Sequence, residues 1–234
     1  MGILYLLPNL LGETGIQQVI PEGTAEVIKR ITVFATEEIK NTRRYLKKLD
    51  KHIDIDRRIF LELNEHTDIR QVESYLTYLE EQDMGIISEA GCPGIADPGA
   101  ALVSLAHRHH YKVVPLVGPS SILLALMASG FSGQQFSFNG YLPIPRPERL
   151  KALKFYEKQS AAENRTQLFI ETPYRNLSLL QDMITALSPR TRLSIACDLT
   201  TEGEYIRTLT LNEWRQEKPE LHKRPALFSL YAGK

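Results

Sequence analysis

The stretch SEAGCPGIADPG, residues 88–99, begins at the last residue of the apolar run Met84–Ser88 and is the most informative part of the sequence for the fold. Its part from Glu89 to Gly99 has eleven residues, three glycines and two prolines. A typical loop between a strand and a helix has only about 2–6 residues. Glycines allow backbone groups to approach a ligand closely, and prolines reduce the entropy lost when the loop becomes ordered. We interpret the stretch as a ligand-binding loop, the alternative being a turn that only joins strand to helix.

On either side of this stretch, short apolar runs alternate with amphipathic stretches, a pattern typical of β-α units in a mostly parallel sheet. We expect a first domain with five strands. The expected strands are Ile3–Leu7, Thr32–Ala35, Arg58–Leu63, Met84–Ser88 and Lys112–Val117. The expected helices are Ala25–Ile31, Ile39–Lys48, Asp68–Glu80, Ala101–His109 and Ser120–Met127.

The segment Ser129–Pro147 interrupts this pattern with three glycines and three prolines, which argue against a long regular element. Beyond it we expect helices near 148–163 and 176–187. The strands expected there are Thr166–Glu171, Thr191–Cys197, Tyr205–Thr210 and Ala226–Ala232, with few helices to separate the last ones. We therefore expect the last strands to pair as hairpins and to form a mixed sheet. The predicted organisation is an N-terminal α/β domain (1–117), a helix and interdomain connection (118–145) and a C-terminal α/β domain (146–234).

Function is expected in the segments that follow the strands, because parallel α/β sheets bind ligands beyond the carboxyl ends of their strands. Besides residues 88–99, two such segments stand out. The segment Val117-Gly118-Pro119-Ser120 precedes a helix that Ser120 or Ser121 can cap, leaving N–H groups for a ligand. The segment Pro8–Glu13 follows the first strand. An ordinary helix cap remains the alternative for the first of these.

Composition excludes several classes of protein. The 234 residues carry a formal charge of zero, so any affinity for RNA must come from local patches. The two cysteines, Cys92 and Cys197, fit neither a disulfide framework nor a metal site, which favours a reducing cytoplasm. No apolar run reaches the roughly 20 residues of a membrane span, so we expect a soluble protein. The cluster at 107–110 is interpreted as a solvated helix end, and no metal site is predicted.

Taken together, the three segments resemble the S-adenosylmethionine-dependent methyltransferases built like the tetrapyrrole methylases. The resemblance is greatest to the bacterial enzymes that methylate a cytidine ribose 2′-hydroxyl in 16S ribosomal RNA. Their S-D-A-G-T-P-x-I-S-D-P-G is matched position by position by residues 88–99, except at Glu89, Cys92 and Ala96. Their P-G-P-S is matched at residues 117–120 except at Val117, and their G-[FY]-L-P is matched at residues 140–143. Ala128-Ser129-Gly130 matches their A-x-S-G without its variable position. The matches cover residues 1–145 well and the remainder loosely.

The resemblance implies two α/β domains, the first with a mostly parallel five-stranded sheet and the second with a mixed sheet, and a cleft between them that holds S-adenosylmethionine. It also implies a homodimer that acts in rRNA processing on ribosomal RNA or the small ribosomal subunit. Carried over residue by residue, the expected cofactor contacts are Pro8, Cys92, Ile95, Ser120, Ser121, Glu171, Cys197 and Leu227. The last three rest on loosely matched sequence.

The chain departs from the family in two loops on the expected substrate side. It has Pro8-Asn9-Leu10-Leu11-Gly12 where members have T-P-I-G-N, and Thr36-Glu37-Glu38-Ile39-Lys40 where they have A-E-D-T-R. The family's H-N-E is kept in part, as Leu63-Asn64-Glu65. A ribose hydroxyl is a weak acid, so a general base would assist its methylation.

The expected base is Glu38 or Glu65, with Asn64 orienting the acceptor. A helix start or an ordinary loop would equally explain these residues.

Two stretches carry local positive charge that could hold RNA phosphates. Residues 40–58 contain eight Lys or Arg and three Asp, and residues 146–158 contain five Lys or Arg and two Glu. Solvated helix faces are the alternative. Two other functions also remain open: methylation of a tetrapyrrole or other small molecule, and a non-catalytic protein that keeps only the cofactor pocket.

Overall fold

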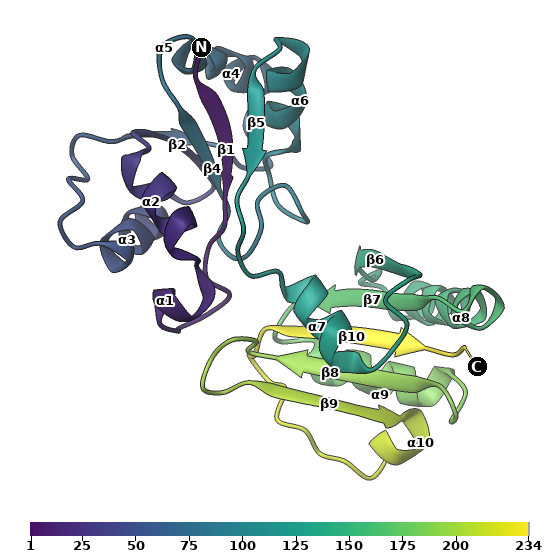
Figure 1. Cartoon of the computed structure of the whole chain (residues 1–234). Coiled ribbons are helices and arrows are strands. Elements are labelled where there is room, and N and C mark those ends of the chain that lie inside the picture. The colour runs from purple at the N-terminus through teal and green to yellow at the C-terminus, as the bar shows by residue number, and fades with distance from the viewer. Residues whose placement is uncertain (234) are drawn as a thin grey trace. The chain divides into compact units, whose positions relative to one another are not determined.

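The computed structural model describes residues 1–233, which form two compact units divided between Ser120 and Ser121. Each unit has its own five-stranded sheet. Figure 1 shows the elements of both units. The two α/β units, one with a parallel sheet and one with a mixed sheet, confirm the expected fold class.

The sheet of the first unit is entirely parallel, with the strand order β3-β2-β4-β1-β5. Its strands are β1 (Ile3–Leu7), β2 (Val33–Thr36), β3 (Ile59–Glu62), β4 (Met84–Ile87) and β5 (Lys112–Pro115). The register pairs Ile87 of β4 with Leu7 of β1 and with Thr36 of β2. The chain therefore leaves β1, β2 and β4 at the same edge of the sheet, and the loops that follow start side by side.

Helices cover both faces of this sheet (Figure 1). One face carries α1 (Ile16–Val19), α2 (Glu22–Arg30) and α3 (Ile39–Leu49), and the other carries α4 (Ile69–Ser74), α5 (Leu76–Glu81) and α6 (Ala100–Arg108). Leu4 and Ile86 pack with the second group, whereas Tyr5 and Leu7 pack with the first. Burial on both faces explains why these strands are nearly continuous apolar runs.

The structure differs from the sequence-based expectation in two details of this unit. The single helix expected over Asp68–Glu80 is two helices, because the chain tightens at Tyr75, whose N–H donates to the carbonyl of Val72. The short helix α1 was not predicted. It has four residues and buries none of them, so it leaves no periodic pattern in the sequence.

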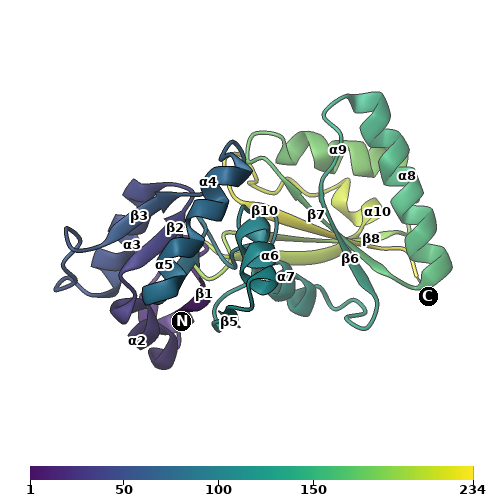
Figure 2. The same ribbon diagram turned by 90° about the horizontal axis from the view of Figure 1, so that it is seen from above.

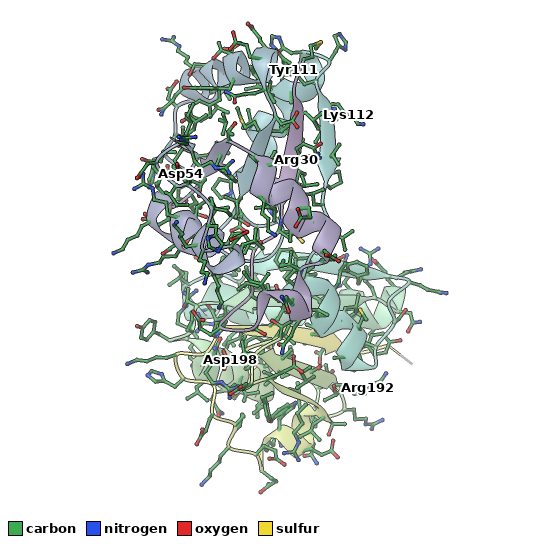
Figure 3. The ribbon with its side chains drawn as sticks, turned by 60° about the vertical axis from the view of Figure 1, so that its left-hand side comes forward. Arg30, Asp54, Tyr111, Lys112, Arg192 and Asp198 are labelled. Atoms are coloured by element: carbon green, nitrogen blue, oxygen red, sulfur yellow. The ribbon has the colours of Figure 1, made fainter. Side chains whose placement is uncertain are left out.

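The sheet of the second unit is mixed, with the strand order β6-β7-β10-β8-β9. Its strands are β6 (Phe136–Tyr141), β7 (Thr166–Glu171), β8 (Arg192–Cys197), β9 (Tyr205–Thr210) and β10 (Ala226–Tyr231). Only the β6 and β7 pair is parallel. Figure 3 labels Arg192 at the start of β8 and Asp198 just beyond its end.

The second sheet is also covered on both faces. Helix α7 (Ser121–Ser129) packs on β8, β9 and β10, and α8 (Arg146–Glu163) and α9 (Asn176–Ala186) lie on the opposite face (Figure 2). The short α10 (Leu211–Trp214) follows β9 and buries Trp214 completely. The core on the α8 and α9 side contains Leu153, Phe169 and Phe228.

The segment expected to be irregular, Ser129–Pro147, contains the strand β6, so that expectation was wrong in part. Phe136 and Phe138 pair regularly with β7, and the register then shifts before Tyr141. Gly140 lies within this shift with a φ of 62°, a backbone conformation that suits glycine. An irregular edge strand that contains a glycine carries little of the alternating pattern by which strands are predicted.

Candidate functional site

The loops after β1 and β4 are joined by a short bridge of backbone hydrogen bonds. The N–H of Asn9 donates to the carbonyl of Gly91 at 2.8 Å, and the N–H of Gly91 donates to the carbonyl of Asn9 at 3.2 Å. These two residues are about eighty positions apart in the chain. The bridge extends the contact between the neighbouring strands into the loops. The two loops therefore form one continuous surface at this edge of the sheet, which we call the rim.

The side chain of Asn9 strengthens this bridge. Its Nδ2 donates to the carbonyls of Ser88 at 2.9 Å and Glu89 at 3.0 Å, and its Oδ1 accepts from the N–H of Leu10 at 2.8 Å. Only 7% of Asn9 is exposed. A buried amide that uses both its donor and its acceptor groups fixes the path of the backbone around it.

The loop after β5 belongs to the same rim. Gly118 faces Pro8 so closely that a Cβ on Gly118 would overlap the proline ring. The Cys92 thiol donates to the carbonyl of Pro119 at 3.5 Å, and the Thr24 hydroxyl of α2 donates to the carbonyl of Val117 at 3.0 Å. All three segments singled out in the sequence therefore meet at one edge of the first sheet.

A cavity of about 860 Å³ lies beside the long loop. It is mostly apolar and is bounded by the loop, by one face of α6 and by the ends of β1, β4 and β5. From the loop it is lined by Cys92, Pro93, Gly94, Ile95 and Gly99. This volume is within the range of pockets that enclose small-molecule ligands, about 300–1,000 Å³.

The backbone of this loop is held in unusual conformations. Gly94 has a φ of 79° and Ala96 has a φ of 63°. A residue with a side chain in the left-handed region costs of order 1 kcal/mol, and such residues are concentrated at ligand sites. Ile95 between them is 50% exposed, so the loop presents an apolar side chain at the mouth of the cavity.

Three predicted cofactor residues of the first unit, Pro8, Cys92 and Ile95, lie at this rim. Cys92 and Ile95 line the cavity, and burial raises the pKa of the Cys92 thiol, which favours its neutral form. Pro8 lies against Gly118. Ser120 follows Pro119 at the end of the first unit, and Ser121 begins α7 in the second. The cofactor role of all these residues stays a prediction.

Three of the cofactor residues predicted in the second unit, Glu171, Cys197 and Leu227, lie together in its sheet. Ala226 of β10 pairs with both Glu171 of β7 and Cys197 of β8, and Leu227 is the next residue of β10. Glu171 and Cys197 are the last residues of their strands, and all three are buried. Glu171 Oε1 accepts a hydrogen bond from Arg175 Nε at 2.9 Å and another from the N–H of Thr172. Its carboxylate thus already has local partners.

The predicted catalytic residues shape their own loops. Glu38 is the N-cap of α3, where its Oε1 accepts from the N–H of Lys40 at 3.1 Å. Asn64 Oδ1 accepts from the N–H of His66, and its Nδ2 donates to Glu62. The side chain of Glu65 is 82% exposed and lies 3.5 Å from the His66 ring nitrogen. Their catalytic roles remain predictions.

Glu37 was given no role of its own by the sequence, yet it lies near enough to Asp97 and Glu89 of the long loop to be influenced by their charges. It follows Thr36 of β2, which is paired with the last residue of β4. Burial raises the pKa of Glu37, and the nearby charges of Asp97, Glu89 and Glu65 raise it further. Among residues 1–233 its carboxylate has no hydrogen bond or ion pair with another side chain. In the sequence, its position next to Glu38 was the one feature that could have drawn attention to Glu37.

No group of three or more His, Cys, Asp or Glu side chains within residues 1–233 is arranged to hold a metal ion. Within the same residues, no helix has the length and apolar character needed to cross a membrane.

Comparison with known proteins identifies the family. The model of the tetrapyrrole (corrin/porphyrin) methylases matches residues 18–214. The chain belongs to the tetrapyrrole methylase family. This membership confirms the methyltransferase class expected from residues 88–99 and 117–120.

Among the curated relatives of this methylase, the ribosomal RNA small subunit methyltransferase I of Escherichia coli O157:H7 is 32% identical over 226 residues. That alignment covers 95% of this chain and 75% of the relative. The protein of the same name from Vibrio cholerae is 32% identical over 212 residues, covering 90% of this chain and 69% of the relative.

Solved structures share the fold of this methylase at low sequence identity. The methyltransferase CobJ has a TM-score of 0.65 at 15% identity, covering 99% of this chain and 94% of that one. Uroporphyrin-III C-methyltransferase of Thermus thermophilus, crystallised with S-adenosyl homocysteine, has a TM-score of 0.54 at 16% identity, covering 98% and 97%. At these identities the likeness shows the fold alone.

Proposed function

We propose that this methylase transfers a methyl group from S-adenosylmethionine to a ribose 2′-hydroxyl of 16S ribosomal RNA. The observation that carries the proposal is the joining of the loops after β1, β4 and β5 into one rim beside a cavity. The names of the relatives support ribosomal RNA as the acceptor. Their identity of about one third, over most of the chain, makes this acceptor the first to test.

The residues at the rim fit the cofactor. Adenosine has flat apolar faces and a polar edge, and the cavity offers apolar side chains together with the backbone of Gly94 and Ile95. The Cys92 thiol is held in its neutral form, which is a weak nucleophile and so would not compete with the acceptor for the methyl group. When bound, S-adenosylmethionine supplies an already activated methyl group, so the protein must mainly align the donor with the acceptor.

The tie between Asn9 and residues 88–91 would serve this alignment. Because Asn9 holds the first and fourth loops together, a ligand at the rim meets a preorganised backbone and loses little free energy in ordering it. The proton of the ribose hydroxyl would pass to a carboxylate near the rim. Glu38 and Glu65 are the predicted bases, and Glu37, which directly precedes Glu38, is a third candidate.

The first experiment measures cofactor binding by calorimetry and then transfer of a labelled methyl group. The acceptors are small ribosomal subunits, free 16S RNA and, as the rival class, tetrapyrroles. We expect S-adenosylmethionine to bind and label to enter the RNA. Labelling of a tetrapyrrole instead would assign the small-molecule function, and binding without transfer to any acceptor would favour the non-catalytic alternative.

A second experiment tests the base by replacing Glu37, Glu38 and Glu65 singly with Gln. The variant that lacks the base should turn over at least about a hundredfold more slowly, the usual lower bound for general-base catalysis. Its affinity for S-adenosylmethionine should be unchanged. Full turnover in all three variants would remove these glutamates from the reaction.

We also propose that the enzyme is a homodimer and works in the cytoplasm, where the small ribosomal subunit is found. The homodimer is an expectation from the family resemblance. Light scattering after gel filtration tests it directly, and the expected mass is twice 26.6 kDa. A single-chain mass at micromolar concentration would contradict it.

A further inference from the structure

Helix α3 is the most basic element of the first unit. Between Ile39 and Leu49 it carries five Lys or Arg and no Asp or Glu, and all five cations are exposed. It begins three residues after Thr36, the end of β2, so its first turn lies at the edge of the sheet that carries the rim. A helix with this composition attracts anions at its surface.

Several cations of α3 and of the segment that follows it, residues 50–58, have structural partners. Arg43 lies over the ring of Phe60, with 5.1 Å from its Cζ to the ring centroid. Lys47 Nζ donates to the carbonyls of Lys51 and Ile53, which closes the turn after α3. Arg58 donates to backbone carbonyls at the end of α2. Part of the positive charge in this region therefore has a structural role.

Lys40 and Arg44 differ from the other three cations of α3. Within residues 1–233 neither side chain has an ion pair or a hydrogen bond. They are four residues apart, so they project from the same face of the helix, about 6 Å apart along its axis. Lys48 continues this row by another four residues, and within the described part of the chain its one ion pair is with Glu13, whose side chain is 98% exposed.

A groove runs beside this row of cations. Its volume is about 280 Å³, and it is bounded by the first loop, by α3 and by the start of the long loop. From α3 it is lined by Asn41, Arg44, Tyr45 and Lys48, and from the long loop by Glu89 and Ala90. Glu89 accepts a hydrogen bond from Asn41 Nδ2, and Glu13 pairs with Lys48. Both acids of the groove therefore have partners within it, whereas the Arg44 guanidinium has none.

The chemistry of this groove selects a phosphodiester strand. A guanidinium binds a phosphate through two parallel hydrogen bonds, and lysines spaced along the same face contact neighbouring phosphates as point charges. The groove ends at Glu89 and Ala90, which lie in the long loop of the rim. A strand lying along α3 would thus pass the place where the acceptor must bind.

We propose that Lys40, Arg44 and Lys48 of α3 bind consecutive backbone phosphates of the RNA strand that carries the acceptor nucleotide. The identity of that strand rests on the proposed function, whereas binding of a polynucleotide to α3 does not. These contacts hold the strand in register and read no base, because phosphate contacts carry no sequence information. The groove beside Arg44 takes one phosphate, and the row of cations sets the direction of the strand.

The test measures binding of a fluorescein-labelled single-stranded RNA oligonucleotide at several salt concentrations. The variant is Lys40→Gln with Arg44→Gln, and both side chains are exposed, so folding should be unaffected. The matched control is Lys112→Gln with Arg215→Gln, two exposed cations placed at the start of β5 and just after α10. Affinity for S-adenosylmethionine and Tm are measured for all proteins.

For single strands each phosphate contact contributes about 0.7 to the slope of log affinity against log salt. We therefore expect the slope of the α3 variant to be about 1.4 smaller than that of the wild type, with the control unchanged. An unchanged slope in the α3 variant, or an equal fall in the control, would overturn the proposal.

Methylation of small ribosomal subunits separates this inference from the proposed function. In an active enzyme the α3 variant should raise the KM for the subunit and leave kcat nearly unchanged. If the wild type methylates the subunit and the α3 variant binds RNA with the wild-type slope, the α3 proposal fails and the function stands. If the slope falls as expected but the wild type labels no ribosomal RNA, the function fails and the binding surface stands.

Discussion

Replacing Asn9 with Asp tests whether one amide holds the rim together. The two side chains have the same shape, but the substitution puts an oxygen where Nδ2 now donates to the carbonyls of Ser88 and Glu89 at 2.9 and 3.0 Å. Two hydrogen bonds are lost, each contributing about 0.5–1.5 kcal/mol, and the two carbonyls then face a negative charge. Because Asn9 is only 7% exposed, water can compensate only in part. We expect a loss of about 2–4 kcal/mol in the free energy of unfolding of the first unit.

Hydrogen exchange measured by mass spectrometry is the suitable assay, because it resolves peptides of the first unit from those of the second. Protection in β1, β4 and residues 88–91 should fall, and affinity for S-adenosylmethionine should fall with it. The control is Asn212→Asp, because Asn212 is exposed and surface substitutions usually change stability by less than about 0.5 kcal/mol. Wild-type exchange and wild-type cofactor affinity in Asn9→Asp would refute the reasoning.

Three further predictions concern other contacts. Gly118→Ala should weaken cofactor binding, measured by calorimetry, because a Cβ would push the loop after β5 away from Pro8; unchanged affinity would show that the loops adapt. Glu37→Gln should raise Tm at pH 7–8, since a carboxyl whose pKa is raised by folding stabilises the protein only while protonated. The gain should vanish as the pH falls below about 4.5, and a gain that persists there would contradict the assignment. Asp182→Asn should cost about 3–5 kcal/mol in urea denaturation, because it leaves the buried Arg149 without its carboxylate at 2.7 Å; a loss below about 1 kcal/mol would exclude a stabilising role for the pair.

Much of the first unit could be predicted from its sequence. Parallel strands buried on both faces are continuous apolar runs, and β1 begins and ends at the residues expected. The meeting of the loops also followed, because parallel strands end at a common edge. The bonds of Asn9 could not be predicted, since they depend on the register between strands about eighty residues apart.

The roles of Glu37 and Glu38 could not be predicted from the sequence either. Two successive glutamates precede α3, and which of them caps the helix depends on where its first turn begins. The structure gives the cap to Glu38 and leaves Glu37 where the charges of Asp97 and Glu89 help to raise its pKa. The cations of α3 were likewise visible as a charged stretch. The path of the chain after the helix gives Lys47 two carbonyl partners, whereas Arg44 has none among residues 1–233, and the sequence alone does not show this difference.

The most direct test of the central claim is the position of the transferred methyl group. Small ribosomal subunits are incubated with the enzyme and labelled S-adenosylmethionine, and the extracted 16S RNA is hydrolysed with alkali. A methylated 2′-oxygen cannot attack the neighbouring phosphate, so we predict that the label stays in an alkali-resistant dinucleotide. Label recovered only in mononucleotides would mean methylation of a base, and an RNA without label would contradict the account altogether.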